Sequence, residues 1–255
     1  MAWLRRYPAV LALLLQVLAG LLAWAVLPVV WRLTGWPLTG LALAGLQGGL
    51  AAVTGHLLGL PRWWLPISLL FMPAVVLGQQ LDWPAWLPAS MFALLLLANW
   101  NSLGERVPLY LSSAPAERAL QQLLDLLPDD AAFIDLGSGL AGSLTRLARA
   151  NPQRQFHGVE SAPLVFLLGW LRSLPLANCR VRYGSLWQVD LAPYALVYCF
   201  LSPAPMPRVW DKAQAEMGHG SLLVSNSFAI PGVAPAQRIE LHDWRAGALL
   251  VWRMP

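Results

Sequence analysis

The charged residues of this 255-residue chain are distributed unevenly, and no other feature restricts its fold as strongly. Residues 1–100 carry five charges, at Arg5, Arg6, Arg32, Arg62 and Asp82, whereas residues 101–255 carry thirteen Lys or Arg and twelve Asp or Glu. Helices in so apolar a segment have no polar face to turn toward water. We therefore expect an apolar helical part, residues 1–100, followed by a part with the charge balance of an ordinary water-soluble domain.

The apolar part divides into four runs, which cover residues 8–31, 36–60, 63–78 and 83–100. The first two exceed the ~20 residues that are needed to cross a hydrocarbon core of ~30 Å, while the last two are shorter and fit either spans or a re-entrant hairpin. Tryptophan gathers at the ends of the runs, as in an aromatic belt. These are Trp31, Trp36, Trp63, Trp64, Trp83, Trp86 and Trp100. The sequence therefore predicts an α-helical transmembrane bundle of about four helices, with the lipid bilayer as a partner.

The arginines near the N-terminus predict the topology. Arg5 and Arg6 favour a cytoplasmic N-terminus, although Arg32 is a contrary charge. Four spans would return the chain to the cytoplasm, so we expect an integral protein of a bacterial inner membrane with residues 101–255 on the cytoplasmic side. A cleaved signal peptide is the alternative, but its apolar region is usually only 7–15 residues long.

The remaining composition excludes two classes of site. The net charge of +4 forms no basic stripe, so we expect no nucleic-acid partner. Cys179 and Cys199 lie twenty residues apart, and the four histidines show no paired spacing. This arrangement predicts buried free thiols rather than a zinc site or a disulfide framework, and no metal.

From residue 131 onward, short β-prone runs alternate with helical stretches. The expected strands cover residues 131–136, 155–160, 179–183, 195–200, 221–228, 238–241 and 249–252, and the expected helices cover 142–150, 162–174 and 206–217. Alternation of this kind predicts a parallel sheet with right-handed crossovers. A closing hairpin, whose turn contains Gly247, adds an antiparallel strand at one edge. Seven strands ending in such a hairpin are typical of the Rossmann-like class I methyltransferases, whereas dinucleotide-binding domains usually have six parallel strands. The predicted domains are residues 1–100, a linker and lead-in helix at 101–130, and a methyltransferase domain at 131–255.

A glycine-rich turn follows the first predicted strand. Glycines there let the backbone approach a ligand at the carboxyl end of the sheet, although G-x-G-x-x-G also occurs in NAD enzymes. Asp135 precedes the first glycine, as in E/D-x-G-x-G of methyltransferases, and Glu160 could accept both ribose hydroxyls. We therefore predict S-adenosylmethionine as cofactor; a nicotinamide oxidoreductase and a merely connecting turn are the alternatives. The predicted cofactor-binding residues here are Asp135, Gly137, Ser138, Gly139, Gly142, Glu160 and Ser161.

The ends of the next two strands supply the rest of the predicted site. Ser185, Leu186 and Trp187 follow the third strand, where the adenine is bound; Trp187 covers the adenine or is a core tryptophan. Tyr198, Phe200 and Pro203 end the fourth strand, where the methyl acceptor is held, and are predicted as catalytic. Pro203 shapes a turn that presents backbone carbonyls to an amine, or belongs to an ordinary strand-end turn.

Together these segments resemble the membrane-anchored lysine methyltransferases of mitochondria that modify the ATP synthase c subunit and the adenine nucleotide translocase, with their prokaryotic relatives. The matching pieces are residues 107–110, 112–120, 133–139, 158–160, 186–190 with Tyr194, and the stretch through Pro203 and Met206. Leu-Trp-x-Val at 186–189 is the most specific piece. The resemblance implies a protein lysine as methyl acceptor and a membrane segment ahead of the catalytic domain.

The chain departs from the family pattern at three places. Leu140 and Ala141 replace the family's Asp-Gly, Ser185 replaces the acidic residue that would hold the adenine amino group, and residues 201–206 replace Val-Pro-x-Met-Met. Loss of one charge-assisted hydrogen bond costs ~1–3 kcal/mol of binding free energy. Two alternatives therefore stand beside the lysine methyltransferase: a methyltransferase for a lipid or small apolar molecule, and a non-catalytic membrane scaffold.

Overall fold

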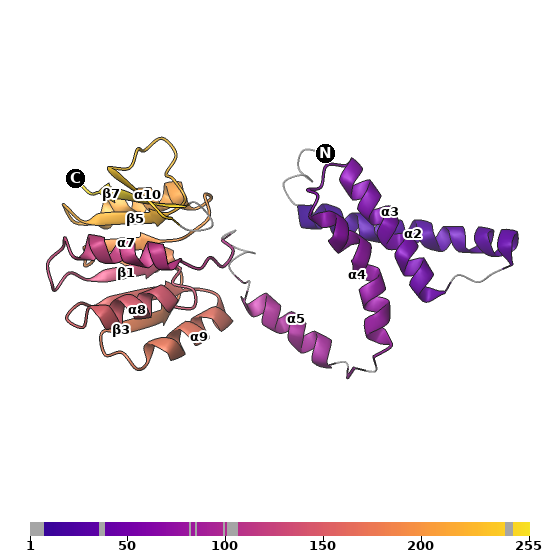
Figure 1. Ribbon diagram of the computed structural model, residues 1–255, viewed down its shortest axis with the longest axis horizontal. Helices are drawn as coiled ribbons and strands as arrows, with labels where there is room; N and C mark the ends of the chain where they lie inside the picture. The colour runs from indigo at the N-terminus through magenta and orange to yellow at the C-terminus, as the bar shows by residue number, and fades with distance from the viewer. Residues whose placement is uncertain are drawn as a thin grey trace. The chain divides into compact units, whose positions relative to one another are not determined.

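The structure is a computed structural model that describes residues 8–35, 39–81, 83–84, 86–98, 100, 107–242 and 247–255. The chain divides into two compact units, Met1–Ala89 and Ser90–Pro255, drawn in Figure 1. Arg5, Arg6, Trp36, Asp82 and Arg106, which bear on the predicted topology, lie outside the described residues.

Each of the four apolar runs forms one helix. These helices are α2 (Pro8–Thr34), α3 (Gly40–Leu57), α4 (Trp64–Gln79) and α5 (Trp86–Ala98). Within the described part of the chain, α2 alone is long and apolar enough to cross a membrane, while α4 and α5 are apolar but shorter. Core helices and signal sequences can have the same length and composition. The transmembrane bundle therefore stays a prediction.

Helices α2, α3 and α4 pack closely through small and amide side chains. Gln16 of α2 donates a hydrogen bond from Nε2 to the Ser68 carbonyl of α4 (2.7 Å), and Gln47 of α3 donates to the Gln16 carbonyl (3.1 Å). At Gly48, an added Cβ would lie 2.2 Å from the Leu69 carbonyl oxygen, so no larger residue fits there. The buried residues of α3 are all small: Ala44, Gly48, Ala51, Ala52 and Gly55.

The C-terminal unit contains a seven-stranded sheet in the order β3-β2-β1-β4-β5-β7-β6. Strands β1 to β5 are parallel, whereas β7 is antiparallel to both β5 and β6. This arrangement confirms the predicted sheet and its closing hairpin. The strands are β1 (Phe133–Leu136), β2 (Phe156–Glu160), β3 (Cys179–Tyr183), β4 (Leu196–Cys199), β5 (Leu222–Asn226), β6 (Gln237–Glu240) and β7 (Ala248–Arg253).

Helices cover both faces of this sheet (Figure 1). One face carries α7 (Ala114–Leu124), α8 (Gly142–Ala150) and α9 (Pro163–Ser173), and the other carries α10 (Met206–Glu216). The division follows from right-handed crossovers, because the chain moves outward from β1 to β3 and then returns to build β4 and β5 in the opposite direction. Each face has its own hydrophobic core, one around Phe133, Phe156 and Tyr198 and one around Ile134, Met206 and Leu223.

The reversal of strand order lies between β1 and β4. All four residues of β1 are buried, as expected for a central strand covered on both faces. The turns that follow β1 and β4 leave toward opposite faces of the sheet and open a crevice between them. Ligands of open α/β sheets bind at such a switch point.

Candidate functional site

The glycine-rich turn between β1 and α8 is held in a conformation that ordinary residues avoid. Gly137 has φ +80° and Gly139 has φ +55°, in the left-handed region that glycine adopts without strain. A Cβ on Gly137 would also lie 3.1 Å from Leu201 Cδ2, which follows β4. The turn therefore runs tightly along the switch point, as the sequence predicted for a backbone that approaches a ligand.

Glu160 fastens this turn to the end of β2. Its Oε2 accepts a hydrogen bond from the Gly139 amide (2.9 Å), and its Oε1 accepts from the amides of Ser161 (2.9 Å) and Ala162 (2.8 Å). The side chain is buried and borders the crevice. These amides fix the orientation of the carboxylate before any ligand arrives.

Asp135 is a second buried acid, on β1. Burial, and secondarily the negative charge of Glu160, raise the pKa of Asp135 to about 8. Its carboxyl group is therefore mostly protonated at neutral pH, and a cation bound beside it would favour ionisation. Buried acids with raised pKa values are typical of functional sites.

The crevice consists of two adjoining cavities that share Tyr110, Gly137 and Phe200. One is narrow (about 40 Å³) and mostly apolar, and the other is wider (about 320 Å³) and polar. The apolar cavity is lined by residues that include Val107, Leu109, Val159, Glu160, Ser161, Val165, Gly184, Leu186 and Leu201. The polar cavity is lined by residues that include Ser112, Asp135, Ser138, Gly142, Arg146, Arg172 and Tyr198.

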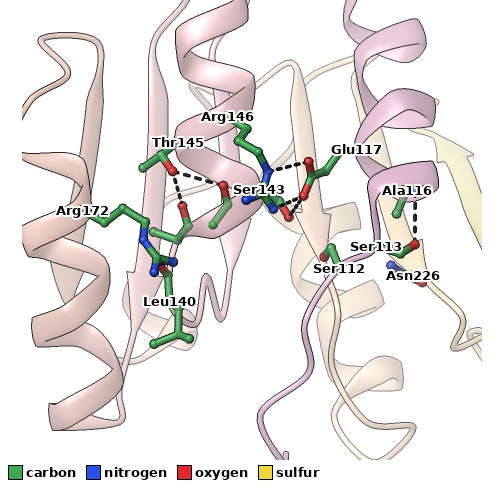
Figure 2. A network of polar contacts seen from close by, with 12 residues as sticks. Ser112, Ser113, Ala116, Glu117, Leu140, Ser143, Thr145, Arg146, Arg172 and Asn226 are labelled. Carbon is green, nitrogen blue, oxygen red and sulfur yellow. Dashed lines mark hydrogen bonds and ion pairs between the residues drawn. The ribbon is translucent and has the colours of Figure 1, made fainter.

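Two arginines converge on the first turn of α8 at the polar cavity. A Cβ on Gly142 would lie 3.4 Å from Arg146 Nη2 and 3.5 Å from Arg172 Nη1. Figure 2 shows Arg146 paired with Glu117 of α7, and Arg172 donating to the Leu140 carbonyl at 2.8 Å. The cavity thus combines a buried acid with two cations beside a helix N-terminus.

One buried polar atom in this cavity has no hydrogen-bond partner in the described structure: the hydroxyl oxygen of Ser138. Ser138 is itself buried, and burial of an unpaired hydroxyl costs free energy. The hydroxyl lies against Gly158, where an added Cβ would be 2.7 Å away, so a ligand in the wider cavity would reach it only after the side chain turned.

The segment before α7 lies across the ends of β4 and β5. The Tyr110 ring stacks on Phe200 with 4.8 Å between centroids and 17° between planes. The Ser112 and Tyr198 hydroxyls are 2.7 Å apart, and Asn226 Nδ2 donates to Tyr198 Oη at 3.0 Å. Burial raises the pKa of the Tyr198 hydroxyl well above its usual range, so this group stays neutral and acts as a hydrogen-bonding group.

The predicted site residues fall into three groups. Those that border the cavities are Asp135, Gly137, Ser138, Gly142, Glu160, Ser161, Leu186, Tyr198 and Phe200. Gly139 lies between them and contributes its amide to Glu160. The third group, Ser185, Trp187 and Pro203, is absent from the lining of both cavities.

Ser185, Trp187 and Pro203 do not line the cavities because each takes part in local structure elsewhere. The Ser185 hydroxyl accepts from the Trp187 amide (3.3 Å) and caps the short helix η1 (Leu186–Gln188). The Trp187 ring lies under the Arg208 guanidinium, 3.9 Å from its Cζ, on the α10 side of the sheet. Pro203 is exposed in the turn before α10. Trp187 is partly buried and packs against the core on this face, and its predicted contact with the adenine stays a prediction.

Tyr110, Ser112, Arg146 and Arg172 are among the crevice residues that carried no predicted role. Arg146 could have been found, because it lies four residues after Gly142 and therefore on the same helix face. The other three reach the crevice through contacts between distant parts of the sequence. In the described part of the chain, no three His, Cys, Asp or Glu residues gather as metal ligands, and Cys179 and Cys199 are buried free thiols.

Comparison with known proteins shows which proteins this domain resembles. Residues 135–237 match the family model described as the ANTKMT methyltransferase domain. The chain is 30% identical over 151 residues to the adenine nucleotide translocase lysine N-methyltransferase of Mus musculus, a match that covers 57% of this chain and 65% of the mouse protein. Its fold is similar to that of an RNA methyltransferase from Salinibacter ruber in complex with S-adenosyl-L-homocysteine, with a TM-score of 0.52, 20% identity, and coverage of 57% of this chain and 94% of that chain. The C-terminal unit therefore has the fold of the S-adenosylmethionine-dependent methyltransferases, and residues 135–237 within it resemble the adenine nucleotide translocase lysine methyltransferases.

Proposed function

We propose that this chain is a membrane-bound, S-adenosylmethionine-dependent methyltransferase that N-methylates a lysine of a protein substrate. The observation that carries the proposal is the two-part crevice at the switch point between β1 and β4, in a domain that matches a methyltransferase family. The mouse relative is named as a lysine N-methyltransferase, which supports the same acceptor here.

The residues of the crevice suit this cofactor. The amino-acid end of S-adenosylmethionine carries an ammonium and a carboxylate, and the polar cavity offers Asp135 for the first and Arg172 or Arg146 for the second. At the border of the apolar cavity, the Glu160 carboxylate would accept hydrogen bonds from the ribose hydroxyls, and the cavity, at about 40 Å³, would have to widen to admit the nucleoside. When bound, the cofactor supplies a methyl group on a positively charged sulfur.

For the acceptor, the chain must bind a lysine and favour its neutral form, because only the unprotonated nitrogen can attack the methyl group. Tyr110 and Phe200, stacked at the junction of the two cavities, form an apolar surface that would lower the pKa of an entering ammonium by desolvation. The neutral Tyr198 hydroxyl is placed to orient a polar group beside them. Alignment of two reacting groups supplies a large share of the rate enhancement in such displacements. We therefore keep Tyr198 and Phe200, together with the Pro203 turn, as the proposed acceptor region.

The N-terminal unit supports a membrane location because its large apolar side chains point outward. Trp24 is 72% exposed and Leu33 is 81% exposed, and other leucines and valines of α2 are exposed beside them. The interior between α2, α3 and α4 instead contains many alanines and glycines, together with Gln16 and the buried Leu11 and Leu15. Small residues inside and large apolar residues outside are typical of helices that pack within lipid. We propose that α2 to α5 lie in a bacterial inner membrane, with the methyltransferase domain on the cytoplasmic side, where its cofactor is made.

The test is methyl transfer by the full chain in membranes. Membranes that contain the chain are incubated with cofactor labelled on the methyl group, and label is followed in protein and in the organic extract. Label on lysine of a membrane protein supports the proposal, and label in the extract would instead indicate a lipid or small apolar acceptor. The matched control is Gly137→Leu, whose side chain meets both a left-handed φ and Leu201. Equal labelling by wild type and Gly137→Leu, or none by wild type in any fraction, would contradict the enzyme proposal.

A further inference from the structure

A strap, residues 107–113, crosses the carboxyl end of the sheet before α7 begins, and it contains neither helix nor strand. Val107 packs against the hydrophobic core on the α10 side of the sheet, and Tyr110 packs against the core on the other side. Gly137, which follows β1, and Leu201, which follows β4, line the same apolar cavity as the strap. The strap therefore passes from one face of the sheet to the other over the switch point.

The walls of the apolar cavity that belong to the sheet are fastened by backbone hydrogen bonds. The amides of Gly137 and Ser138 both donate to the Val159 carbonyl at 3.0 Å. The Gly184 amide donates to the Glu160 carbonyl, also at 3.0 Å. Movement of these walls would break the bonds and leave their polar groups unpaired, so we expect these walls to stay in place when a ligand binds.

The strap forms a wall of a different kind. Pro108 has no amide hydrogen, and within the described residues the backbone groups of Leu109 and Tyr110 make no hydrogen bond to the sheet. Side chains hold the strap near α7 instead, through the Tyr110 ring stacked on a phenylalanine and through the hydroxyl of Ser112, which is labelled in Figure 2. Segments with few backbone hydrogen bonds open at a low free-energy cost. The wall at Pro108 and Leu109 is therefore the one that we expect to move.

Leu109 lies on the glycine-rich turn although it is not part of either hydrophobic core. It is 44% exposed, and a Cβ on Gly139 would lie 3.1 Å from Leu109 Cδ1. The cavity that Leu109 helps to enclose has a volume of about 40 Å³, whereas pockets for small organic ligands usually measure about 300–1,000 Å³. A nucleoside can therefore enter this cavity only if a wall moves away.

We propose that the strap is the lid of the nucleoside site and that Leu109 is the residue that covers the bound nucleoside. The strap lifts at Pro108 and Leu109, turns about its anchored end at Tyr110 and Ser112, and closes again with the Leu109 side chain against the ligand. This inference rests on the proposed placement of the nucleoside in the apolar cavity, and it adds the residue that controls access to that cavity. Closure of the strap excludes water from the crevice during methyl transfer.

The test measures how fast the full chain in detergent binds and releases tritiated S-adenosylmethionine. Association is followed by rapid filtration at increasing cofactor concentrations, and release is followed after addition of excess S-adenosylhomocysteine. Leu109→Ala shortens the covering side chain and Leu109→Trp enlarges it. The matched control is Leu126→Ala, at a 78% exposed leucine in the turn after α7 that lines neither cavity.

The proposal predicts that the wild-type association rate levels off at high cofactor concentration, at the rate of strap opening. Leu109→Ala should raise this limit and release the cofactor roughly tenfold faster, because much of the apolar cover is lost. Leu109→Trp should lower the limit, since a larger side chain has to move, and Leu126→Ala should behave as wild type in both measurements.

Two results would overturn the proposal. One is equal association and release rates for wild type and Leu109→Ala. The other is a change of the association limit in the same direction in Leu109→Ala and Leu109→Trp, which indicates general damage to the site rather than a lid. Binding without methyl transfer would contradict the enzymatic proposal and leave the lid intact, whereas absence of cofactor binding by wild type would overturn both.

Discussion

Asp135→Asn should make the C-terminal domain more stable while it removes the proposed contact with the cofactor. The substitution keeps the shape of a buried side chain and removes the group whose pKa burial and Glu160 raise to about 8. In the unfolded chain this carboxyl titrates near its usual value of 3.8. The folded state therefore binds more protons than the unfolded state between these two values. Stability from this group is fully present below pH 4 and is lost as pH rises toward 8.

The magnitude follows from the size of the pKa shift. Each unit corresponds to about 1.4 kcal/mol, so the raised pKa of Asp135 lowers the stability of the folded state by about 4 kcal/mol at pH 7 relative to its value in acid. For a domain of this size, that free energy corresponds to roughly 8–16 °C in melting temperature. Wild type should thus lose thermal stability steadily between pH 5 and pH 8, and Asp135→Asn should lose much less.

The assay is calorimetry of the full chain in detergent across this pH range, following the transition that bound S-adenosylmethionine shifts upward. The exposed Asp130→Asn is the control and should follow wild type at every pH. Bound cofactor should raise the wild-type transition more at pH 8 than at pH 6, because its ammonium favours the ionised acid. If the transition temperatures of Asp135→Asn and wild type change with pH in the same way, the pKa of Asp135 is not raised in the folded state.

Three further substitutions separate the remaining elements of the structure. Arg172→Gln should weaken binding of S-adenosylmethionine roughly tenfold or more but leave adenosine binding unchanged, since one charge-assisted hydrogen bond is lost; titration calorimetry measures both, and the exposed Arg149→Gln should change neither. Tyr198→Phe removes the partner of the buried Asn226 amide and of the half-buried Ser112 hydroxyl, and should cost about 1–3 kcal/mol of unfolding free energy, with no new ionisation in the pH–rate profile; an unchanged melting temperature would contradict the network. Gly48→Val should separate α3 from α4 and lower the melting temperature of the N-terminal unit, whereas Gly49→Val, with nothing within 4 Å of an added Cβ, should not.

The order of the secondary structure in the C-terminal unit was predictable because local features mark it. The α8 range 142–150 and the β3 range 179–183 agree with the structure, since glycine turns and alternating hydrophobicity delimit both segments. Membership of the glycine-rich turn in the site was also predictable, because a turn after the first parallel strand always lies at the carboxyl end of the sheet.

Long-range side-chain contacts were not predictable. Ser112 meets Tyr198 across 86 residues, and Arg172 meets Leu140 across 32, so no spacing in the sequence relates them. The position of Trp187 likewise depends on Arg208, a residue of α10, which follows Trp187 by 21 positions in the sequence. Packing of whole elements decides such contacts, whereas local pattern decides only which elements form.

Ser185→Asp should raise the affinity for S-adenosylmethionine, because it introduces the acidic residue that the family pattern has before Leu-Trp. The fold has room for this change, because Ser185 caps η1 through its side-chain oxygen and aspartate is an equally good N-cap. Ser185 lies between Gly184 and Leu186, both of which line the apolar cavity proposed for the nucleoside. A carboxylate there that accepts from the adenine amino group should raise affinity for S-adenosylmethionine about tenfold, the scale of one charge-assisted hydrogen bond.

The decisive comparison uses a cofactor analogue that lacks this amino group. Ser185→Asp should bind the analogue no better than wild type does, whereas Ser185→Asn, a cap of similar size without the charge, should give a smaller gain with S-adenosylmethionine. Equal gains in affinity for cofactor and analogue would show that the carboxylate acts through its charge rather than through a hydrogen bond to the adenine amino group. In that case the adenine would lie elsewhere, and the apolar cavity beside Leu186 would not be the nucleoside site.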